Sequence, residues 1–257
     1  MSRARVEDRG DRLVVVNGNA ARRGALTPEF LAAITEAAER AADPRIRAVI
    51  LSSEGEFFCA GGDLNVLIER QKMTEDQRRA QIDRLHDRIR AIRACPVPVI
   101  AAVEGGAAGA GMSIALACDM IVAAEDAKFT AAYVKAGLVP DGGLTAALAR
   151  LLPRPLAMEI CLLGRPGGAH PMAARGAVNL LTPKGGAEAG AMAIADALAQ
   201  GPRSTQGTIR AMVAQAYDNS EAAQLDRERD AMGRATGSAD AAEGISAFLG
   251  KRKPDWS

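Results

Sequence analysis

The sequence predicts an α/β fold with a helical region at its C-terminal end. Short runs of β-branched residues alternate with helical patterns up to Gly137, which is typical of layered α/β domains. After Gly137 the apolar spacing is almost wholly helical. A chain of 257 residues suits one large core with an appendage. We therefore expect a core over residues 1–199 and a helical C-terminal subdomain over residues 200–257.

The N-terminal elements are expected to be two strands with a helix between them. Residues 12–16 (RLVVV) and 48–52 (AVILS) are rich in β-branched side chains and predict strands. Between them, Thr27 is placed to cap a helix whose first position is Pro28, a residue whose fixed φ suits a helix start. This helix should run to about Ala41.

A charged helix and a buried strand follow. From Thr74 to about Arg93, apolar residues recur at three- and four-residue steps, which predicts an amphipathic helix. Residues 97–103 (VPVIAAV) form a nearly unbroken apolar run, as expected for a strand buried on both faces. A turn rich in Gly and Ala then leads into a predicted helix over residues 110–117 and a strand over residues 120–123.

The remaining elements are predicted to be helices. Their length near the C-terminus suits a contact between subunits, and the pattern allows a self-packed bundle equally well. The expected helices cover residues 143–152, 155–163, 185–200, 204–216 and 221–249, the last with a break near Gly237.

The charge balance and the cysteines exclude several classes of protein. Lysine plus arginine (32) nearly cancel aspartate plus glutamate (31), which leaves no net field to attract nucleic acid or an anionic membrane. No apolar stretch approaches the roughly 20 residues that a membrane span requires. The four cysteines stand far apart, without a metal-binding spacing. We therefore expect a cytoplasmic protein with no metal, no nucleic-acid partner and no membrane partner.

Two glycine-rich turns are the candidate sites of chemistry. Residues 57–64 and residues 104–112 lead into helices, so both place backbone N–H groups where a ligand can approach. Either turn alone has a structural explanation. Asp63 is a typical helix N-cap, and the small residues of the second turn allow tight packing of a helix on a sheet. The pair is more specific than either turn.

These segments resemble the signature of a known family. FCAGGDL (58–64) is followed by PVIAAVEGGAAGAGMSIALACDMIVAAEDAKF (98–129), KAGLVPDGGLT (135–145) and SADAAEGISAFLGKRKPDW (238–256). Over essentially the whole chain the sequence is similar to the crotonase (enoyl-CoA hydratase/isomerase) superfamily, and within it to the branch of the ring-epoxyphenylacetyl-CoA isomerases. The resemblance implies a crotonase-like spiral of ββα turns with a C-terminal helical oligomerisation subdomain. It also implies an acyl-CoA thioester as substrate, a homotrimer or dimer of trimers, and no cofactor, since CoA is part of the substrate.

The resemblance also implies an active site. The backbone N–H groups of Gly62 and Ala110 would form an oxyanion hole for the thioester oxygen, and losing one such donor typically costs about 10²- to 10³-fold in rate. The two glutamates that position water in hydratases of the family are replaced here by Ser113 and Tyr133, and neither can act as a carboxylate base. One carboxylate, Asp141, remains at a matching place. In the resembling isomerases, an aspartate at this place moves a proton between acyl carbons. We therefore expect an acyl-CoA isomerase with Asp141 as acid and base.

A further set of residues is implied to bind the substrate. Basic side chains before the first long helix and near the C-terminus would meet the CoA phosphates, although each could equally be a solvated surface charge. Lys251 is one of these cations. The predicted substrate-binding residues are Arg22, Arg23, Ala25, Ala60, Gly61, Asp63, Tyr133 and Lys253.

Several alternatives stay open at this stage. Asp141 could merely cap the helix that follows it, and Tyr133 could merely pack against its neighbours. An enoyl-CoA hydratase with a nonstandard carboxylate and a noncatalytic acyl-CoA binder are the competing functions. A serine hydrolase built on Ser113 is disfavoured, because His86 is expected to face solvent from a charged helix and His170 is expected in a loop.

Overall fold

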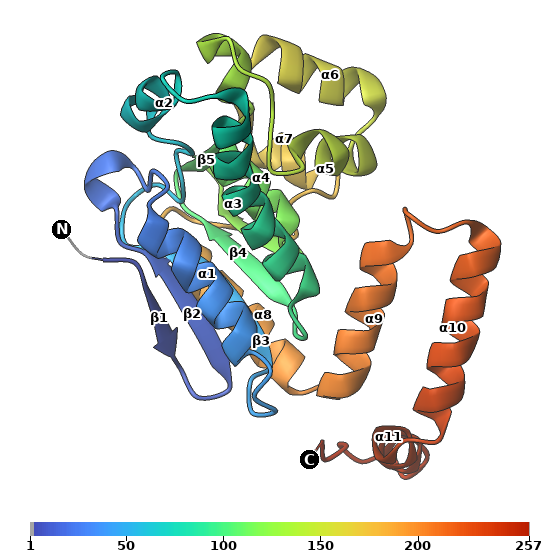
Figure 1. Ribbon diagram of the computed structural model, residues 1–257. Coiled ribbons are helices and arrows are strands. Elements are labelled where there is room, and N and C mark those ends of the chain that lie inside the picture. Colours follow the sequence, from blue (N-terminus) through green and yellow to red (C-terminus); the bar gives the residue numbers. More distant parts are fainter. Residues whose placement is uncertain (1–2, 257) are drawn as a thin grey trace.

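The computed structural model describes residues 3–256, which form a mixed α/β core surrounded by helices (Figure 1). Two sheets make up the core. The strands of the larger sheet, in spatial order, are β1 (Arg5–Asp8), β2 (Arg12–Asn17), β3 (Ala48–Ser53), β4 (Val99–Val103), β6 (Met120–Ala124) and β9 (Leu180–Thr182). Only the β1–β2 pairing in this sheet is antiparallel. The smaller sheet contains β5 (Gly106–Ala108), β7 (Lys128–Thr130) and β8 (Gly167–Gly168).

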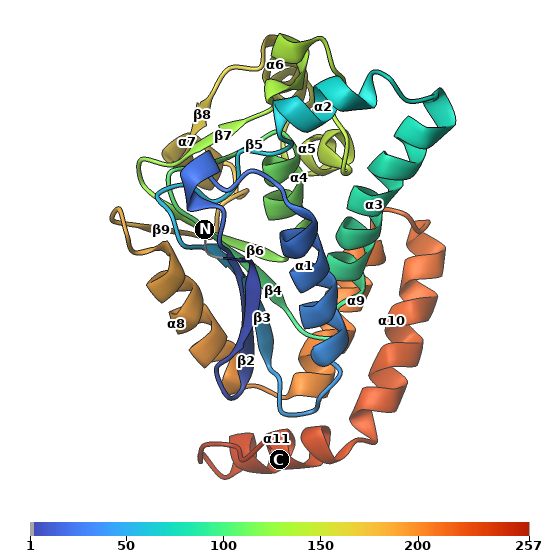
Figure 2. The same cartoon turned by 60° about the vertical axis from the view of Figure 1, so that its left-hand side comes forward.

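Helices cover both faces of the larger sheet (Figure 2). Helices α1 (Pro28–Arg40) and α3 (Glu75–Ala94) lie on one face, and α8 (Ala187–Ala199) lies on the other. Because side chains alternate along a strand, Leu13 and Val15 join the core under α1 and α3, whereas Val14 and Val16 pack with the alanines of α8. This burial on both faces explains why the central strands read as continuous apolar runs.

The other helices lie at the two ends of the core. Near one end are α2 (Leu64–Arg70), α4 (Ala110–Ala117), α5 (Leu144–Leu151), α6 (Arg154–Leu163) and α7 (Ala169–Ala173). At the other end are α9 (Arg203–Gln215), α10 (Glu221–Thr236) and α11 (Ala239–Leu249). Two 3₁₀ helices, η1 (Ala20–Arg22) and η2 (Ala132–Ala136), complete the set that residues 3–256 form.

The helix starts predicted from the sequence are confirmed. The Thr27 hydroxyl accepts a hydrogen bond from the Phe30 amide, and Pro28 occupies the first turn of α1. Thr74 and Gln77 form a reciprocal capping box at the start of α3. The short strands β1, β5, β7, β8 and β9 were not predicted, because two to four residues carry too little periodicity to indicate a strand.

One supersecondary unit positions the chemistry. Strand β4 belongs to the larger sheet, β5 crosses to the smaller sheet, and α4 begins directly afterwards. All eight residues of α4 are buried, so its first turn is fixed within the core. The loop before this helix is therefore fixed in position by strands of both sheets.

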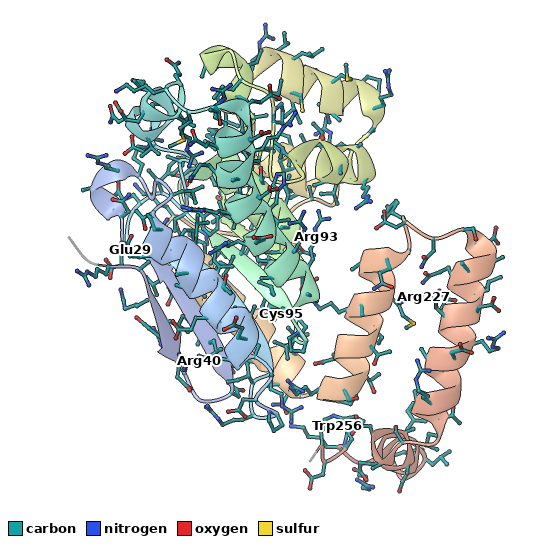
Figure 3. All side chains as sticks on the ribbon, viewed as in Figure 1. Glu29, Arg40, Arg93, Cys95, Arg227 and Trp256 are labelled. Atoms are coloured by element: carbon teal, nitrogen blue, oxygen red, sulfur yellow. The ribbon has the colours of Figure 1, made fainter. Side chains whose placement is uncertain are left out.

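The C-terminal helices extend away from the core (Figure 1). Helix α9 is anchored by the buried Arg210, and Trp256 lies against α11, where its ring would contact a Cβ placed on Gly244 (Figure 3). Across residues 3–256, no helix is both long and apolar enough to cross a membrane.

Candidate active site

The two glycine-rich turns lie side by side in a parallel register. Cys59 and Ala107 form a parallel β-bridge, in which the Ala108 amide donates to the Cys59 carbonyl at 2.8 Å. Gly62 and Ala110 stand three residues beyond the two bridged positions. The bridge therefore carries both predicted oxyanion-hole residues to corresponding places at the ends of the two turns.

Glycine is required where the turns touch. Gly61 has a φ of +88°, and a Cβ on it would lie 2.6 Å from the Ala108 carbonyl oxygen and 3.1 Å from the Ala110 nitrogen. Gly111, in the first turn of α4, comes so close to Cys59 that a Cβ would lie 2.2 Å from the Cys59 carbonyl oxygen. The glycines thus permit a close backbone approach as well as the left-handed conformation of Gly61.

The two predicted amides are available to a ligand. Within residues 3–256, neither the Gly62 N–H nor the Ala110 N–H donates a hydrogen bond to another group of the chain. Ala110 is the first residue of α4, so its N–H is one of the donors that a helix leaves unpaired at its positive end. Two free amides at the ends of adjacent turns can stabilise a negative oxygen.

Cys59 is the one thiol within the first turn, and it contributes structure. It is fully buried, and burial raises the pKa of its thiol to about 12. The thiol therefore stays protonated near neutral pH and does not act as a nucleophile.

Asp141 is brought together with Ser113 and Tyr133. The Tyr133 hydroxyl donates to Asp141 Oδ1 at 2.7 Å, and the Ser113 and Tyr133 hydroxyl oxygens are 3.1 Å apart. Ser113 Oγ also donates to the Asp141 backbone carbonyl at 2.9 Å. Three elements supply this cluster: Ser113 lies on α4, Tyr133 on η2, and Asp141 in the loop before α5.

The cluster adjoins the oxyanion-hole turn. Ser113 stands three residues after Ala110, and this spacing places the two on one side of α4. A Cβ on Gly109 would lie 3.9 Å from the Tyr133 ring carbon that carries the hydroxyl. The free amides and the Asp141 carboxylate therefore belong to one site.

The helix-cap alternative for Asp141 is wrong. Helix α5 has Gly143 at its N-cap, and no side chain caps it. The Asp141 carboxylate bonds to Tyr133 instead, and only the Asp141 backbone carbonyl bonds to the first turn, where it accepts from the Leu144 amide. The side chain of Asp141 therefore does not serve as the N-cap of α5, the usual structural role of an aspartate just before a helix.

Burial changes the acidity of Tyr133. Desolvation and the neighbouring Asp141 charge both raise the pKa of the Tyr133 hydroxyl above its ordinary value. The phenol therefore keeps its proton at neutral pH and remains a hydrogen-bond donor. Its ring also packs against the core, so Tyr133 serves both packing and the cluster.

His86 was expected to face solvent, and this expectation is wrong. The side chain is half-buried on α3, and its Nε2 accepts a hydrogen bond from the Gly142 amide at 3.3 Å. Gly142 is held from the other side by Ser113, since a Cβ there would lie 2.8 Å from the Ser113 Cβ. The loop that carries Asp141 is thus clamped between α3 and α4.

Most of the predicted substrate-binding residues line the first turn. Asp63 caps α2 through the Asn65 amide at 2.9 Å, and its carboxylate forms an ion pair with Arg22. Both interactions lower the pKa of Asp63, the amide more than the guanidinium. The Arg23 guanidinium lies 4.2 Å from the centre of the Phe57 ring.

The backbone ties the same segment to the turn. The Ala60 amide donates to the Arg23 carbonyl at 3.0 Å, and the Leu26 amide donates to the Gly61 carbonyl at 2.8 Å. Ala25, which lies between Arg23 and Leu26 in the sequence, is buried. Ala25, Ala60, Gly61, Arg22 and Arg23 are therefore brought together with the oxyanion-hole turn.

Lys251 and Lys253 are not brought to this site within one chain. Lys253 Nζ bonds to Gln200 Oε1 at 2.6 Å, just after the end of α8. Figures 1 and 2 both show α11 at the end of the molecule opposite α2 and α6. The expected shared contact of these lysines and Arg22 with one ligand is absent from the single chain over residues 3–256.

The Ser113–Tyr133–Asp141 cluster was not found from the sequence. Its members were recognised separately, two as replaced glutamates and one as a remaining carboxylate. The spacing of 20 residues between Ser113 and Tyr133, and of 8 between Tyr133 and Asp141, carries no local pattern that indicates contact.

Within residues 3–256, no group of three or more His, Cys, Asp or Glu side chains is arranged to hold a metal ion.

Comparison with known proteins gives a consistent result. A sequence profile of the family described as "Enoyl-CoA hydratase/isomerase" matches residues 17–257. A "Probable enoyl-CoA hydratase" of Rhodobacter capsulatus is 36% identical over 248 residues, which cover 96% of this chain and 92% of that protein. A "1,2-epoxyphenylacetyl-CoA isomerase" of Escherichia coli is 37% identical over 216 residues, covering 84% of this chain and 82% of that protein.

Solved structures agree with the fold. The crystal structure of an enoyl-CoA hydratase from Polaromonas sp. JS666 is 40% identical, with a TM-score of 0.96 and 99% of each chain covered. A structure described as a putative enoyl-CoA hydratase from Streptomyces coelicolor is 30% identical, with a TM-score of 0.94, covering all of this chain and 94% of that one. The crotonase-like fold expected from the sequence is confirmed.

Proposed function

The chain belongs to the enoyl-CoA hydratase/isomerase family, and from this premise we propose that it is an acyl-CoA isomerase in which Asp141 moves a proton on a CoA thioester. The observation that carries the proposal is the composition of the site. It combines two unpaired amides, at Gly62 and Ala110, with one carboxylate, while hydroxyls occupy the positions of the two glutamates that hydratases of the family use.

The proposed reaction is a shift of a double bond along the acyl chain. Asp141 removes a proton from the carbon beside the thioester carbonyl, and the electrons of that C–H bond move into the thioester. The resulting negative oxygen lies between the Gly62 and Ala110 amides. Asp141 then returns the proton two carbons further along, which forms a new C–H bond and brings the double bond into conjugation. Atoms and electrons balance without a cofactor.

The positions of Ser113 and Tyr133 argue against the two-glutamate hydration mechanism. A hydroxyl cannot take a proton from water near neutral pH, and the raised pKa of Tyr133 makes its phenolate still less accessible. Both hydroxyls bond to Asp141, so this cluster, within residues 3–256, contains a single carboxylate base. A single base is sufficient for proton transfer between two carbons.

The test is the replacement Asp141→Asn, with a 3-enoyl-CoA such as cis-3-hexenoyl-CoA as the probe. The rise in absorbance of the conjugated 2-enoyl thioester reports isomerisation. We expect a fall of about 10²- to 10⁴-fold in the rate, because an amide cannot accept the proton. Asp126→Asn, on an exposed turn between β6 and β7, is the matched control and should keep the wild-type rate.

Water addition is the second candidate reaction, since several of the similar proteins, including those of Rhodobacter capsulatus and Polaromonas, are named hydratases. In that case Asp141 would activate water, and a 2-enoyl-CoA such as crotonyl-CoA would lose its conjugated absorbance. An enzyme that hydrates crotonyl-CoA but does not isomerise the 3-enoyl probe would overturn the isomerase proposal. Binding of both thioesters without turnover would support a noncatalytic acyl-CoA binder instead.

We also propose that the chain assembles into a homotrimer or a dimer of trimers through its C-terminal helices. These helices expose apolar side chains that a single chain leaves uncovered. The exposed set includes Ile209, Val213, Leu225, Met232, Ile245, Phe248 and Leu249. Light scattering should give three or six times 26.7 kDa, and Phe248→Asp should lower that mass. A monomer of 26.7 kDa would contradict the assembly.

A further inference from the structure

The Asp141 carboxylate has two unlike oxygens. Oδ1 accepts the Tyr133 hydroxyl at 2.7 Å. In the part of the chain that the structure describes, residues 3–256, the Asp141 side chain makes its hydrogen bond through Oδ1, and Oδ2 has no hydrogen-bond or ion-pair partner. One oxygen is therefore held by the protein, and the other is left for a ligand.

Tyr133 is itself held in place. Its hydroxyl oxygen lies 3.1 Å from Ser113 Oγ, and Ser113 is almost completely buried, with 2% of its surface exposed. The same Ser113 oxygen donates to the backbone carbonyl of Asp141. The side chain and the backbone of Asp141 are thus fixed by one closed set of contacts, and its carboxylate has little freedom to rotate.

We propose that Tyr133 is a positioning residue that holds Asp141 by Oδ1, so that Oδ2 is the atom that takes and returns the substrate proton. This inference rests on the proposed isomerase function and adds the atom and the residue that orients it. When the substrate C–H bond breaks, the proton bonds to Oδ2, and Tyr133 keeps its own proton. When Oδ2–H breaks, the proton bonds to the second carbon, and the Tyr133 contact is unchanged.

The hydrogen-bond chain fits a group that must exist in two protonation states. With Asp141 ionised, the Tyr133 hydroxyl stabilises the charge on Oδ1. With a proton on Oδ2, Oδ1 becomes a carbonyl oxygen and still accepts from Tyr133. The orientation of the carboxyl group is therefore the same before and after each transfer, as a shuttle between two carbons requires.

The test compares Tyr133→Phe with Tyr217→Phe, which alters the other of the two tyrosines in the chain. Tyr217 is 68% exposed and lies beyond the end of α9. With the 3-enoyl-CoA probe, we expect Tyr133→Phe to lower kcat by about 10²-fold with little change in KM, because the phenyl ring keeps the packing while the carboxylate loses its orientation. Tyr217→Phe should keep the wild-type kcat.

A double variant separates orientation from a general structural effect. The double variant Tyr133→Phe/Asp141→Asn should be no slower than Asp141→Asn alone, since Tyr133 acts through Asp141. Ser113→Ala, which removes the second hydroxyl, should lower kcat in the same direction and serves where Tyr133→Phe is poorly folded by circular dichroism.

The outcomes are distinguishable. Wild-type kcat in both Tyr133→Phe and Ser113→Ala, together with a large loss in Asp141→Asn, would overturn the positioning role and leave the isomerase intact. Additive losses in the double variant would also overturn it. An undiminished rate in Asp141→Asn would overturn the isomerase proposal and this inference with it.

Discussion

The Tyr133 hydroxyl donates a 2.7 Å hydrogen bond to Asp141 Oδ1, and this contact joins a 3₁₀ helix to the loop that precedes α5. The bond lies beside the first turn of α4, where the Ala110 amide is unpaired among residues 3–256. It places the one carboxylate of the site next to the group that would stabilise a thioester oxygen.

The buried Tyr133 hydroxyl makes the stability of the folded chain depend on pH in the alkaline range. The folded chain holds the pKa of Tyr133 above its ordinary value of 10.0, mainly through burial, so the unfolded chain releases this proton first as pH rises. The contribution is present below pH 10 and is lost above it, by at most about 1.4 kcal/mol per pH unit. Urea unfolding between pH 9 and pH 11 should show a steeper decline for the wild type than for Tyr133→Phe. Equal slopes would contradict the prediction.

The replacement Gly61→Ala should separate the contact between the turns from simple backbone strain. A Cβ on Gly61 would lie 2.6 Å from the Ala108 oxygen, whereas a Cβ on Gly10, at a similar φ of +87°, would meet nothing within 4 Å. Gly10→Ala should therefore lose only the roughly 1–2 kcal/mol of the left-handed conformation. Gly61→Ala should lose more stability in urea titrations and should also lose activity. Similar losses of stability in the two variants, with activity kept in both, would show that the turns can separate freely.

The replacement Ala110→Pro tests the oxyanion hole directly, because proline has no N–H. Proline is well tolerated at the first position of a helix, and Ala110 occupies that position in α4. We expect a loss of about 10²- to 10³-fold in kcat for the 3-enoyl-CoA probe. Glu221→Pro, at the exposed first position of α10, is the matched control and should keep the rate. If Ala110→Pro folds normally and keeps its kcat, the amide has no part in the reaction.

The buried Arg210 should be essential for stability. It bonds to Asp119 Oδ2 at 2.6 Å and to the backbone carbonyls of Ile92, Arg93 and Cys95, and so joins α9 to the end of α3 and the segment after it, where Figure 3 labels Arg93 and Cys95. Arg210→Met removes the guanidinium from all four acceptors, although Asp119 Oδ2 still accepts from the Val99 amide and the Ile92 carbonyl from the Cys95 amide. It should reduce the free energy of unfolding by about 3–5 kcal/mol, because Asp119 loses its charge partner and two carbonyls lose their donor.

The control for this prediction is a surface ion pair. Arg229 is 68% exposed and pairs with Asp226 and Asp230 along α10. Arg229→Met should change the free energy of unfolding by less than about 1 kcal/mol, because solvent screens such pairs. Chemical denaturation of both variants measures the two free energies of unfolding. Comparable losses would mean that the burial of Arg210 does not increase its contribution to stability.

Much of the fold could be predicted because the relevant signals are local. Thr27 and Asp63 cap their helices as expected, since a short polar side chain bonds to an amide two or three residues ahead. The central strands were recognised because burial on both faces gives unbroken apolar runs. Strands of two to four residues were missed, because their partners and not their own sequences define them.

The candidate site divides in the same way. The sequence by itself determined the two glycine-rich turns, and its resemblance to the family indicated that Ser113 and Tyr133 replace two glutamates and that Asp141 is retained, because such motifs consist of residues close together in the chain. Only the tertiary structure decided that Tyr133 bonds to Asp141, that His86 contacts the Gly142 amide, and that Lys253 bonds to Gln200 after the end of α8. Contacts of this kind depend on how sheets and helices pack, and packing is set by the whole core. Local spacing specifies where a helix starts, whereas only the packed core specifies which side chains meet.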